Sequence, residues 1–158
     1  MARRPHELLH LLTRAERLSV RRVQSVLDEF DCSVEAWRVL DLLSDGEGHH
    51  MTAVADHAFL PAPSLTKLID QLVDQNLVFR RVDPADRRRV LVQLTPRGMG
   101  RRQRLSRAVL ADWGEPEPLL AEDEEEQLET LLNLLAGALG GSGKVTTARG
   151  ERAVGRAR

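Results

Sequence analysis

Basic side chains are concentrated in one stretch of the chain. Residues 77–107 contain ten Arg and only two acidic residues, Asp83 and Asp86. A dense positive segment of this kind suits a phosphate-binding surface, because each neutralised phosphate releases condensed counterions from a nucleic acid. Three of the arginines, Arg87, Arg88 and Arg89, are consecutive. A single-sign run is also typical of a solvated loop, so charge alone leaves both interpretations open.

The net charge of the whole chain hides this pattern. The 158 residues carry 23 Lys+Arg and 24 Asp+Glu, for a net charge of −1, which by itself argues against a nucleic-acid partner. Residues 108–143, however, contain nine acidic residues and no basic one, and they offset the basic segment. The neutral sum therefore says little about partners.

Helical periodicity predicts the elements that surround the basic segment. Apolar residues recur at spacings of three and four over residues 5–30, 33–43, 63–75 and 96–113. A further helix with a leucine-rich stripe over 128–139 is expected to stop at residues 140–141. Ser33 is a good N-cap, and Thr52 is expected to cap a short helix that ends near Ala58. Thr95 and the following proline predict the start of the helix at residue 96.

The predicted helix over 63–75 has two different faces. Its buried stripe consists of Leu65, Leu68, Ile69 and Leu72. The opposite side is polar and includes Ser64, Thr66, Lys67, Gln71, Asp70 and Asp74. Asn76 follows at a position where a helix end requires a left-handed residue. Most amphipathic helices simply pack against a core, so this polar face indicates a function only in combination with the adjacent elements of the sequence.

Two aliphatic runs, residues 77–82 and 89–94, predict the strands of a β-hairpin. Asp83-Pro84-Ala85-Asp86-Arg87-Arg88 forms the turn between them. The elements follow the order of a winged helix-turn-helix: a short helix, a break over residues 59–63, a helix with a polar face, and a hairpin with arginines at its tip. Such an exposed helix fits the major groove of DNA, and the hairpin can enter the adjacent minor groove. The predicted fold is mostly α with a small β-hairpin wing, flanked by terminal dimerisation helices.

At these residues the sequence resembles the MarR family of bacterial transcription regulators. The segment Ser-Leu-Thr-Lys-Leu-Ile-Asp-Gln-Leu at 64–72 is similar to the recognition helix of that family, and residues 80–98 are similar to its wing. The resemblance covers residues 6–139. Two departures are Asn76, where Gly is common, and the prolines Pro61 and Pro63 beside the start of the recognition helix.

The resemblance implies a DNA-binding surface. Arg88 would insert into the minor groove, with Asp86 holding the wing arginine by an ion pair. The implied DNA-binding set is Ser64, Thr66, Lys67, Gln71, Asp86, Arg87, Arg88 and Arg89. The implied partner is double-stranded DNA with a pseudo-palindromic operator, because the family functions as a homodimer.

The domain organisation follows from the same elements. Residues 1–32 are expected to form an N-terminal dimerisation helix, and residues 33–95 the winged helix-turn-helix lobe. Residues 96–140 would supply C-terminal dimerisation helices, and residues 141–158 a disordered basic tail. The apolar stripes over 8–30 and 128–139 would build the dimer, although packing within one chain is an alternative.

Many regulators that the sequence resembles bind an anionic aromatic effector. Five residues are candidates to line such a pocket: His10, Arg14, Arg17, Trp37 and Trp113. Arginine can pair with a carboxylate and tryptophan can stack on a ring. The simpler interpretation places Arg14 and Arg17 on the surface and Trp37 in the core.

No metal or cofactor is expected. Cys32 is the single cysteine, and the helix over 96–113 contains no His to complete a zinc site. Acidic neighbours of Cys32 are expected to raise its pKa, which argues against redox sensing. A single cysteine cannot form an internal disulfide. Since no signal-peptide core or membrane helix is visible, a cytoplasmic location is expected.

The predicted function is a sequence-specific DNA-binding transcriptional regulator, a repressor relieved by a small effector. The alternative is a winged-helix protein-interaction module that does not bind DNA. An enzyme is not expected, because the sequence contains no Ser/His/Asp, paired-carboxylate or phosphate-loop pattern.

Overall fold

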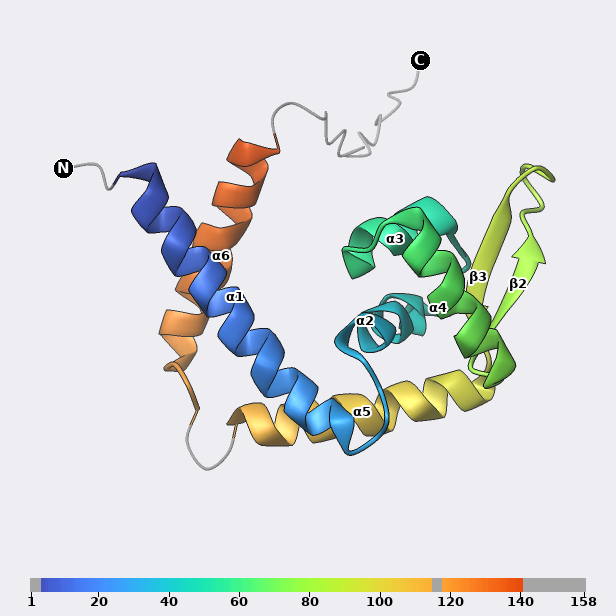
Figure 1. Cartoon of the computed structure of the whole chain (residues 1–158), viewed down its shortest axis with the longest axis horizontal. Helices are drawn as coiled ribbons and strands as arrows, with labels where there is room; N and C mark the ends of the chain where they lie inside the picture. The colour runs from blue at the N-terminus through green and yellow to red at the C-terminus, as the bar shows by residue number, and fades with distance from the viewer. Residues whose placement is uncertain (1–3, 115–117, 141–158) are drawn as a thin grey trace, which may run out of the picture. The chain divides into compact units, whose positions relative to one another are not determined.

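The computed structural model describes residues 4–114 and 118–140. In order along the chain, its elements are α1 (Pro5–Asp28), α2 (Val34–Leu42), the 3-10 turn η1 (Leu43–Asp45), β1 (His49–His50), α3 (Met51–Ala58), α4 (Ala62–Asp74), β2 (Val78–Val82), β3 (Val90–Leu94), α5 (Pro96–Gly114) and α6 (Glu122–Leu139) (Figure 1). This mostly helical fold with a small β-hairpin confirms the predicted fold class. The expected tail over 141–158 lies outside the described residues.

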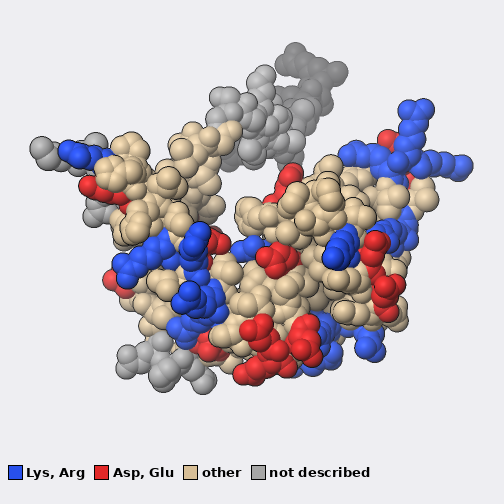
Figure 2. All heavy atoms as spheres, viewed as in Figure 1, with Lys and Arg blue, Asp and Glu red and all other residues tan. Residues whose placement is uncertain are grey.

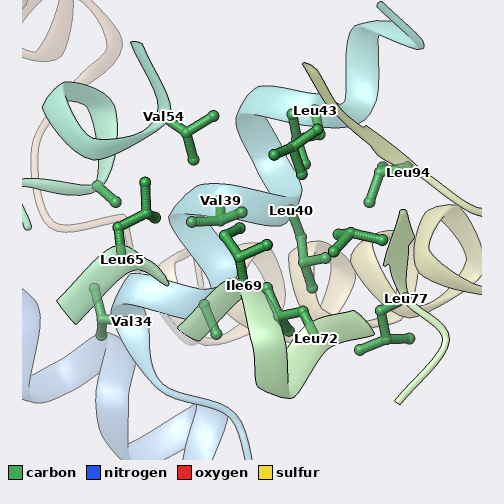
Figure 3. Packing of buried hydrophobic residues seen from close by; sticks show 14 of the residues in the cluster. Val34, Val39, Leu40, Leu43, Val54, Leu65, Ile69, Leu72, Leu77 and Leu94 are labelled. Carbon is green, nitrogen blue, oxygen red and sulfur yellow. The ribbon is translucent and has the colours of Figure 1, made fainter. Parts of the chain in front are cut away.

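The chain divides into two units, residues 1–117 and residues 118–158. In the first unit, α2, α3 and α4 pack together beside the sheet and form a lobe with its own core (Figure 3). Val39, Val54 and Ile69 come from the three helices and are completely buried in it. Helices α1 and α5 pack against each other, and the Arg22 Nε lies 2.8 Å from Asp112 Oδ2 between them.

Local sequence signals account for most of the helix ends. Ser33 Oγ accepts a hydrogen bond from the Ala36 N–H at 3.0 Å, which confirms the predicted cap of α2. Asn76 adopts a φ of +55°, as its place after α4 predicts. The predicted cap of α3 is wrong, because this helix begins at Met51, with His50 at the N-cap and without a side-chain cap. Thr52 therefore lies inside the first turn.

The sheet has three strands in the order β1-β3-β2, and both pairs are antiparallel. The hairpin β2–β3 was expected, with Val78 opposite Leu94 and Val82 opposite Val90. The third strand, β1, was not predicted from the sequence, and its His49 pairs with Val92 of β3. A strand of two residues is too short to show the alternation that identifies strands in a sequence.

The start of α5 is fixed against the end of α4. Thr95 Oγ1 accepts a hydrogen bond from the Gly98 N–H at 2.9 Å, which confirms the predicted cap. A Cβ added at Gly98 would lie 1.9 Å from the Leu77 carbonyl oxygen, so only glycine allows this close approach. The helix that follows the wing is thereby held directly on the segment that precedes the wing.

Helix α6 forms the described part of the second unit. It contains no buried residue, and its leucines Leu128, Leu131, Leu132, Leu134 and Leu139 are exposed. The N-terminal half of α1 also exposes leucines, at Leu8, Leu9, Leu11 and Leu18. In the described part of the chain, no helix combines the length and apolar character needed to cross a membrane.

Candidate nucleic-acid interface

Helix α4 presents a polar face to solvent. Ser64, Thr66, Lys67 and Gln71 are all exposed. On the other side Leu65, Ile69 and Leu72 are buried in the lobe and Leu68 is half-buried, which confirms the predicted stripe (Figure 3). The apolar side of α4 packs into the core, and this packing fixes the direction in which the polar side faces.

The hydroxyl of Thr66 already has a partner inside the helix. Thr66 Oγ1 donates a hydrogen bond to the Ala62 carbonyl oxygen at 3.0 Å. This back-bonding consumes the single hydroxyl proton. Toward a ligand, Thr66 therefore offers an acceptor and a methyl group, whereas Lys67 offers donors only.

A strained turn sets the start of α4. Phe59 has a φ of +55°, in the left-handed region that bulky residues rarely adopt. The Leu60 N–H donates to the Ala55 carbonyl oxygen at 3.0 Å, closing the end of α3. Pro61 then takes the extended conformation at the N-cap of α4, and Pro63 lies in its first turn. The two prolines thus begin the helix instead of distorting its polar face.

An ion pair joins α4 to the hairpin. Arg80 Nη2 on β2 lies 2.5 Å from Asp70 Oδ1 on the polar face of α4. The pair neutralises a carboxylate that would otherwise repel a phosphate group near Lys67. It also links the helix to the wing, so the two parts of the candidate surface have a defined relative position.

The loop at the hairpin tip is closed by its aspartates. The Arg88 N–H donates to Asp86 Oδ1 at 3.1 Å, and the Ala85 N–H donates to Asp83 Oδ1 at 2.9 Å. Within the described residues, no ion pair joins Asp86 to an arginine of the wing, contrary to the expectation. In the free chain Asp86 shapes the loop through the backbone, and this leaves the guanidinium groups available.

Arg87, Arg88 and Arg89 are exposed on this loop. In Figure 2, Lys and Arg side chains project from the far end of the hairpin. The loop is closed at its base by a hydrogen bond from the Asp83 N–H to the Arg89 carbonyl oxygen at 3.0 Å. The positive charge of the wing therefore sits on a short, hydrogen-bonded loop.

Strand β1 and η1 brace the base of the wing. His50 Nε2 lies 3.2 Å from Asp83 Oδ2. Among the described residues, Asp83 is the one polar or charged residue that is buried. Gln93 Nε2 donates to the Gly46 carbonyl oxygen at 2.6 Å, and Gln93 Oε1 accepts from Arg81 Nε at 2.8 Å. Both networks tie the hairpin to the 43–50 segment.

These bracing residues were missed by sequence reasoning. In the sequence, Arg80 counts only toward the basic segment, Asp83 toward the turn and Gln93 toward the second strand, and His50 is not singled out. Gln93 lies between the buried Val92 and Leu94, and this alternation is the signal that places it on the outer face of the hairpin. The actual partners of these residues depend on strand register, which local sequence does not show.

The structure separates the five residues proposed to line an effector pocket. His10, Arg14 and Arg17 are exposed on the N-terminal and middle parts of α1. Trp37 is half-buried on α2, and its Nε1 donates to Ser106 Oγ on α5 at 3.4 Å. Trp113 lies near the end of α5, with the Arg22 guanidinium 5.9 Å from the centre of its ring. Contacts within one chain therefore do not assemble them as a set.

Cys32 lies between α1 and α2. Burial raises the pKa of its thiol, while Arg101 and a backbone hydrogen bond from Trp37 lower it. The direction agrees with the expectation, but the cause is burial rather than the acidic neighbours. Among the described residues, no group of three or more His, Cys, Asp or Glu side chains is placed to hold a metal ion.

Comparisons with known proteins agree on one family. A family model described as "MarR family" matches residues 30–89, which span α2 through the tip of the wing. The HTH-type transcriptional regulator MhqR of Bacillus subtilis (strain 168) is 25% identical over 132 residues, or 84% of this chain and 91% of that protein.

Solved structures give the same result. CouR from Rhodococcus jostii RHA1, in a crystal structure bound to p-coumaroyl-CoA, is 28% identical with a TM-score of 0.71, covering 80% of this chain and 89% of that chain. A MarR-family transcriptional regulator from Rhodococcus sp. RHA1 is 25% identical with a TM-score of 0.74, covering 85% of this chain and 96% of that chain. MhqR and the Rhodococcus sp. RHA1 protein are described as transcriptional regulators and not as enzymes.

Proposed function

Since this chain belongs to the MarR family of transcriptional regulators, we propose that it binds double-stranded DNA in a sequence-specific manner and regulates transcription. The observation that carries this proposal is the joining of two surfaces. The polar face of α4 and the arginine-tipped wing are linked by the Arg80–Asp70 ion pair. Because this ion pair joins the helix to the wing, both parts can face one duplex at the same time.

Helix α4 supplies the contacts to the major groove. Its 13 residues correspond to a length of about 20 Å, enough to lie in a groove about 12 Å wide. Lys67 and Gln71 are donors for base edges or phosphates, and Ser64 lies in the first turn, where backbone N–H groups also point toward phosphate. Thr66 contributes its methyl group or an acceptor, because its proton is held by Ala62.

The wing supplies the minor-groove contact. Arg88 enters the groove, whose negative potential attracts a guanidinium group. Arg87 and Arg89 bind the phosphates on either side. Asp86 takes part indirectly, by holding the Arg88 backbone.

The terminal helices supply the dimer. The exposed leucines of α1 and α6 form apolar surface of a kind that usually marks an interface. The boundaries 1–32, 33–95 and 96–140 describe this division between the DNA-binding lobe and the dimerisation helices. A two-fold dimer places two α4 helices on a pseudo-palindromic operator with half-sites about one helical turn apart.

The chain acts as a repressor whose DNA binding is relieved by a small effector. CouR, which is similar over most of its length, binds p-coumaroyl-CoA in its crystal structure, and this supports an anionic aromatic effector here. His10, Arg14, Arg17, Trp37 and Trp113 are candidates to contact it, with residues of α1 reaching a pocket of the partner subunit. Two copies are needed for this set to meet, because one chain separates its members.

Fluorescence anisotropy with a labelled random-sequence duplex, measured over a series of salt concentrations, tests DNA binding. We expect the logarithm of the association constant to fall linearly with the logarithm of salt. Arg88→Ala should weaken binding by about 1 to 3 kcal/mol and reduce the salt slope by about 0.9. Arg107→Ala, an exposed arginine on α5, is the matched control and should leave both values unchanged.

Binding that ignores salt, or that is unchanged in Arg88→Ala, would contradict the proposal. The chain would then be better described as a winged-helix module that binds a protein partner. Circular dichroism of each variant verifies that the fold is retained.

A further inference from the structure

Two adjoining cavities lie where the end of α1, the end of α4 and the first half of α5 meet. The larger has a volume of about 310 Å³ and is lined by Phe30, Asp31, Gln75, Leu77, Arg97, Arg101 and Arg104. The smaller, of about 200 Å³, shares Asp31, Gln75, Leu77 and Arg101 with it and extends to Cys32 and Gln71. The shared residues make the two cavities neighbours, with Arg101 between them.

The three arginines share one face of α5. Their spacing of four and then three residues places Arg97, Arg101 and Arg104 above one another along the helix. Arg101 donates a hydrogen bond to the Phe30 carbonyl oxygen, which holds its guanidinium group at the cavity wall. Arg97 and Arg104 take part in no ion pair with any described residue.

A neighbouring arginine shows the contrast. Arg102, on the same helix, donates to Asp41 Oδ1 from Nε at 3.0 Å and from Nη2 at 2.7 Å. Its donors are used to hold α5 against α2. Among the described residues, Arg97 and Arg104 have no such structural partner, so their N–H groups remain available to a ligand, while Arg101 uses one donor on the Phe30 carbonyl oxygen.

The charge and the lining restrict the kind of ligand. Three arginines face one carboxylate, that of Asp31, which leaves an excess of two positive charges. Phe30 and Leu77 add an aromatic and an aliphatic surface. A phosphate monoester carries a charge of about −1.5 to −2 at neutral pH and offers three acceptor oxygens to arginine.

We propose that this cavity binds a small organic phosphate, a monoester whose phosphate group contacts Arg97, Arg101 and Arg104 and whose apolar part contacts Phe30 and Leu77. The volume of the larger cavity suits a ligand of this size. Arginine is preferred over lysine at such sites because its planar fork pairs with two phosphate oxygens at once.

The walls of the site are fixed by the fold. Asp31 has a φ of +50°, and the Cys32 N–H donates to the Leu27 carbonyl oxygen at 3.2 Å, so the connection from α1 to α2 has a defined shape. Gly98, next to Arg97, is pressed against Leu77. The backbone around the site therefore has its shape before the ligand binds, whereas the exposed side chains of Arg97 and Arg104 would lose freedom on binding.

The site also touches the candidate DNA-binding helix. Gln71 lines the smaller cavity, and Gln75 at the end of α4 lines both. A ligand that contacts Gln75 would favour one position of α4 over others, and this shift would change the affinity of the protein for DNA. This coupling rests on the proposed function, whereas binding of the phosphate does not.

Isothermal titration of the full chain with phenyl phosphate and with inorganic phosphate, in the absence of DNA and at matched ionic strength, tests the site. We expect phenyl phosphate to bind more tightly than inorganic phosphate, because only the ester has an apolar part. The double variant R97Q/R104Q should weaken phenyl phosphate binding by at least about tenfold, since each lost charge-assisted hydrogen bond is strong. Arg107→Gln, outside the cavity lining, should bind as the unchanged protein does.

Three results would overturn the proposal. The first is no heat of binding above that of a sodium chloride control. The second is an equal loss of affinity for phenyl phosphate in R97Q/R104Q and in Arg107→Gln, which would indicate general charge attraction. Equal affinity for phenyl phosphate and inorganic phosphate would exclude an organic ligand. Because no DNA is present, failure here leaves the test of DNA binding untouched, and failure of DNA binding leaves this test untouched.

Discussion

The lobe built from α2–α4 and the sheet differs from α6 in how far its aliphatic side chains are exposed to solvent. Ile69 and Val54 in the lobe are completely buried, whereas Leu131, Leu134 and Leu139 on α6 are 54%, 66% and 75% exposed. Both regions are rich in apolar residues, so composition does not separate them. The difference teaches that the lobe satisfies its core within one chain, while α6 carries apolar surface suited to a partner.

This comparison assigns different consequences to similar mutations. A change in the lobe should lower the stability of each subunit. A change on the exposed face of α6 should leave the subunit folded and weaken its association. The following predictions test that division.

The largest effect is expected at Gly98, where the lobe meets α5. A Cβ in Gly98→Ala would lie 1.9 Å from the Leu77 carbonyl oxygen, so the backbone must move. We expect a loss of more than about 4 kcal/mol in the free energy of unfolding, measured by urea denaturation.

Gly100→Ala is the matched control on the same helix. Its added Cβ would lie no closer than 3.7 Å to the nearest of the surrounding atoms, and alanine favours a helix by about 0.5 to 1 kcal/mol over glycine. We expect a small gain in stability. Equal urea midpoints for the two variants would contradict the close packing of α5 on Leu77.

Truncation of one apolar side chain in each region tests the comparison directly. Ile69→Ala should lower the free energy of unfolding by about 2 to 5 kcal/mol, because it opens a cavity in the core. Leu131→Ala should change the subunit stability by less than about 0.5 kcal/mol but raise the dissociation constant of the dimer, measured by sedimentation at several protein concentrations. If Leu131→Ala destabilised the subunit as strongly as Ile69→Ala and left association unchanged, the division would be wrong.

The smallest effect is expected at the edge of the lobe, at Asp45. Burial acts to raise the pKa of this carboxyl, but hydrogen bonds from the Glu47 N–H and from His49 outweigh it and lower the pKa below the ordinary value of 3.8. A lowered folded-state pKa stabilises the protein above the unfolded value, and that contribution disappears as pH falls through the folded pKa.

Asp45→Asn should therefore be slightly less stable than the unchanged protein at neutral pH, and the difference should vanish in acid below 3.8. Urea midpoints for both proteins across this range give the measurement. A difference that grows as the pH falls would show that the sign is wrong.

The sequence predicted the frame of the lobe well, because helix periodicity, caps and the hairpin turn are local signals. Ser33 and Asn76 act as their residue types predict. The failures were non-local. Strand β1 exists only because His49 and His50 pair with β3. Thr52 is not the N-cap of α3 because His50, two residues earlier, occupies that position.

The residues predicted to contact DNA are exposed on α4 and on the wing loop, but the hydrogen bonds and ion pairs around them differ from those expected. Asp86 was expected to hold an arginine side chain, and it instead accepts a backbone N–H. The Arg80–Asp70 link between wing and helix was not foreseen, because it joins residues ten positions apart whose facing depends on tertiary packing. The arginines of α5 were counted as charge, although their four-and-three spacing already placed them on one face.

Selection of bound duplexes from a randomised DNA library, using the full chain, tests the central claim most directly. We predict enrichment of a pseudo-palindrome with half-sites about 10 base pairs apart, and loss of base preference within the half-sites when Lys67 and Gln71 are both changed to Ala. Enrichment of no sequence, or of one unaffected by these changes, would contradict the assignment of α4 as the helix that reads DNA.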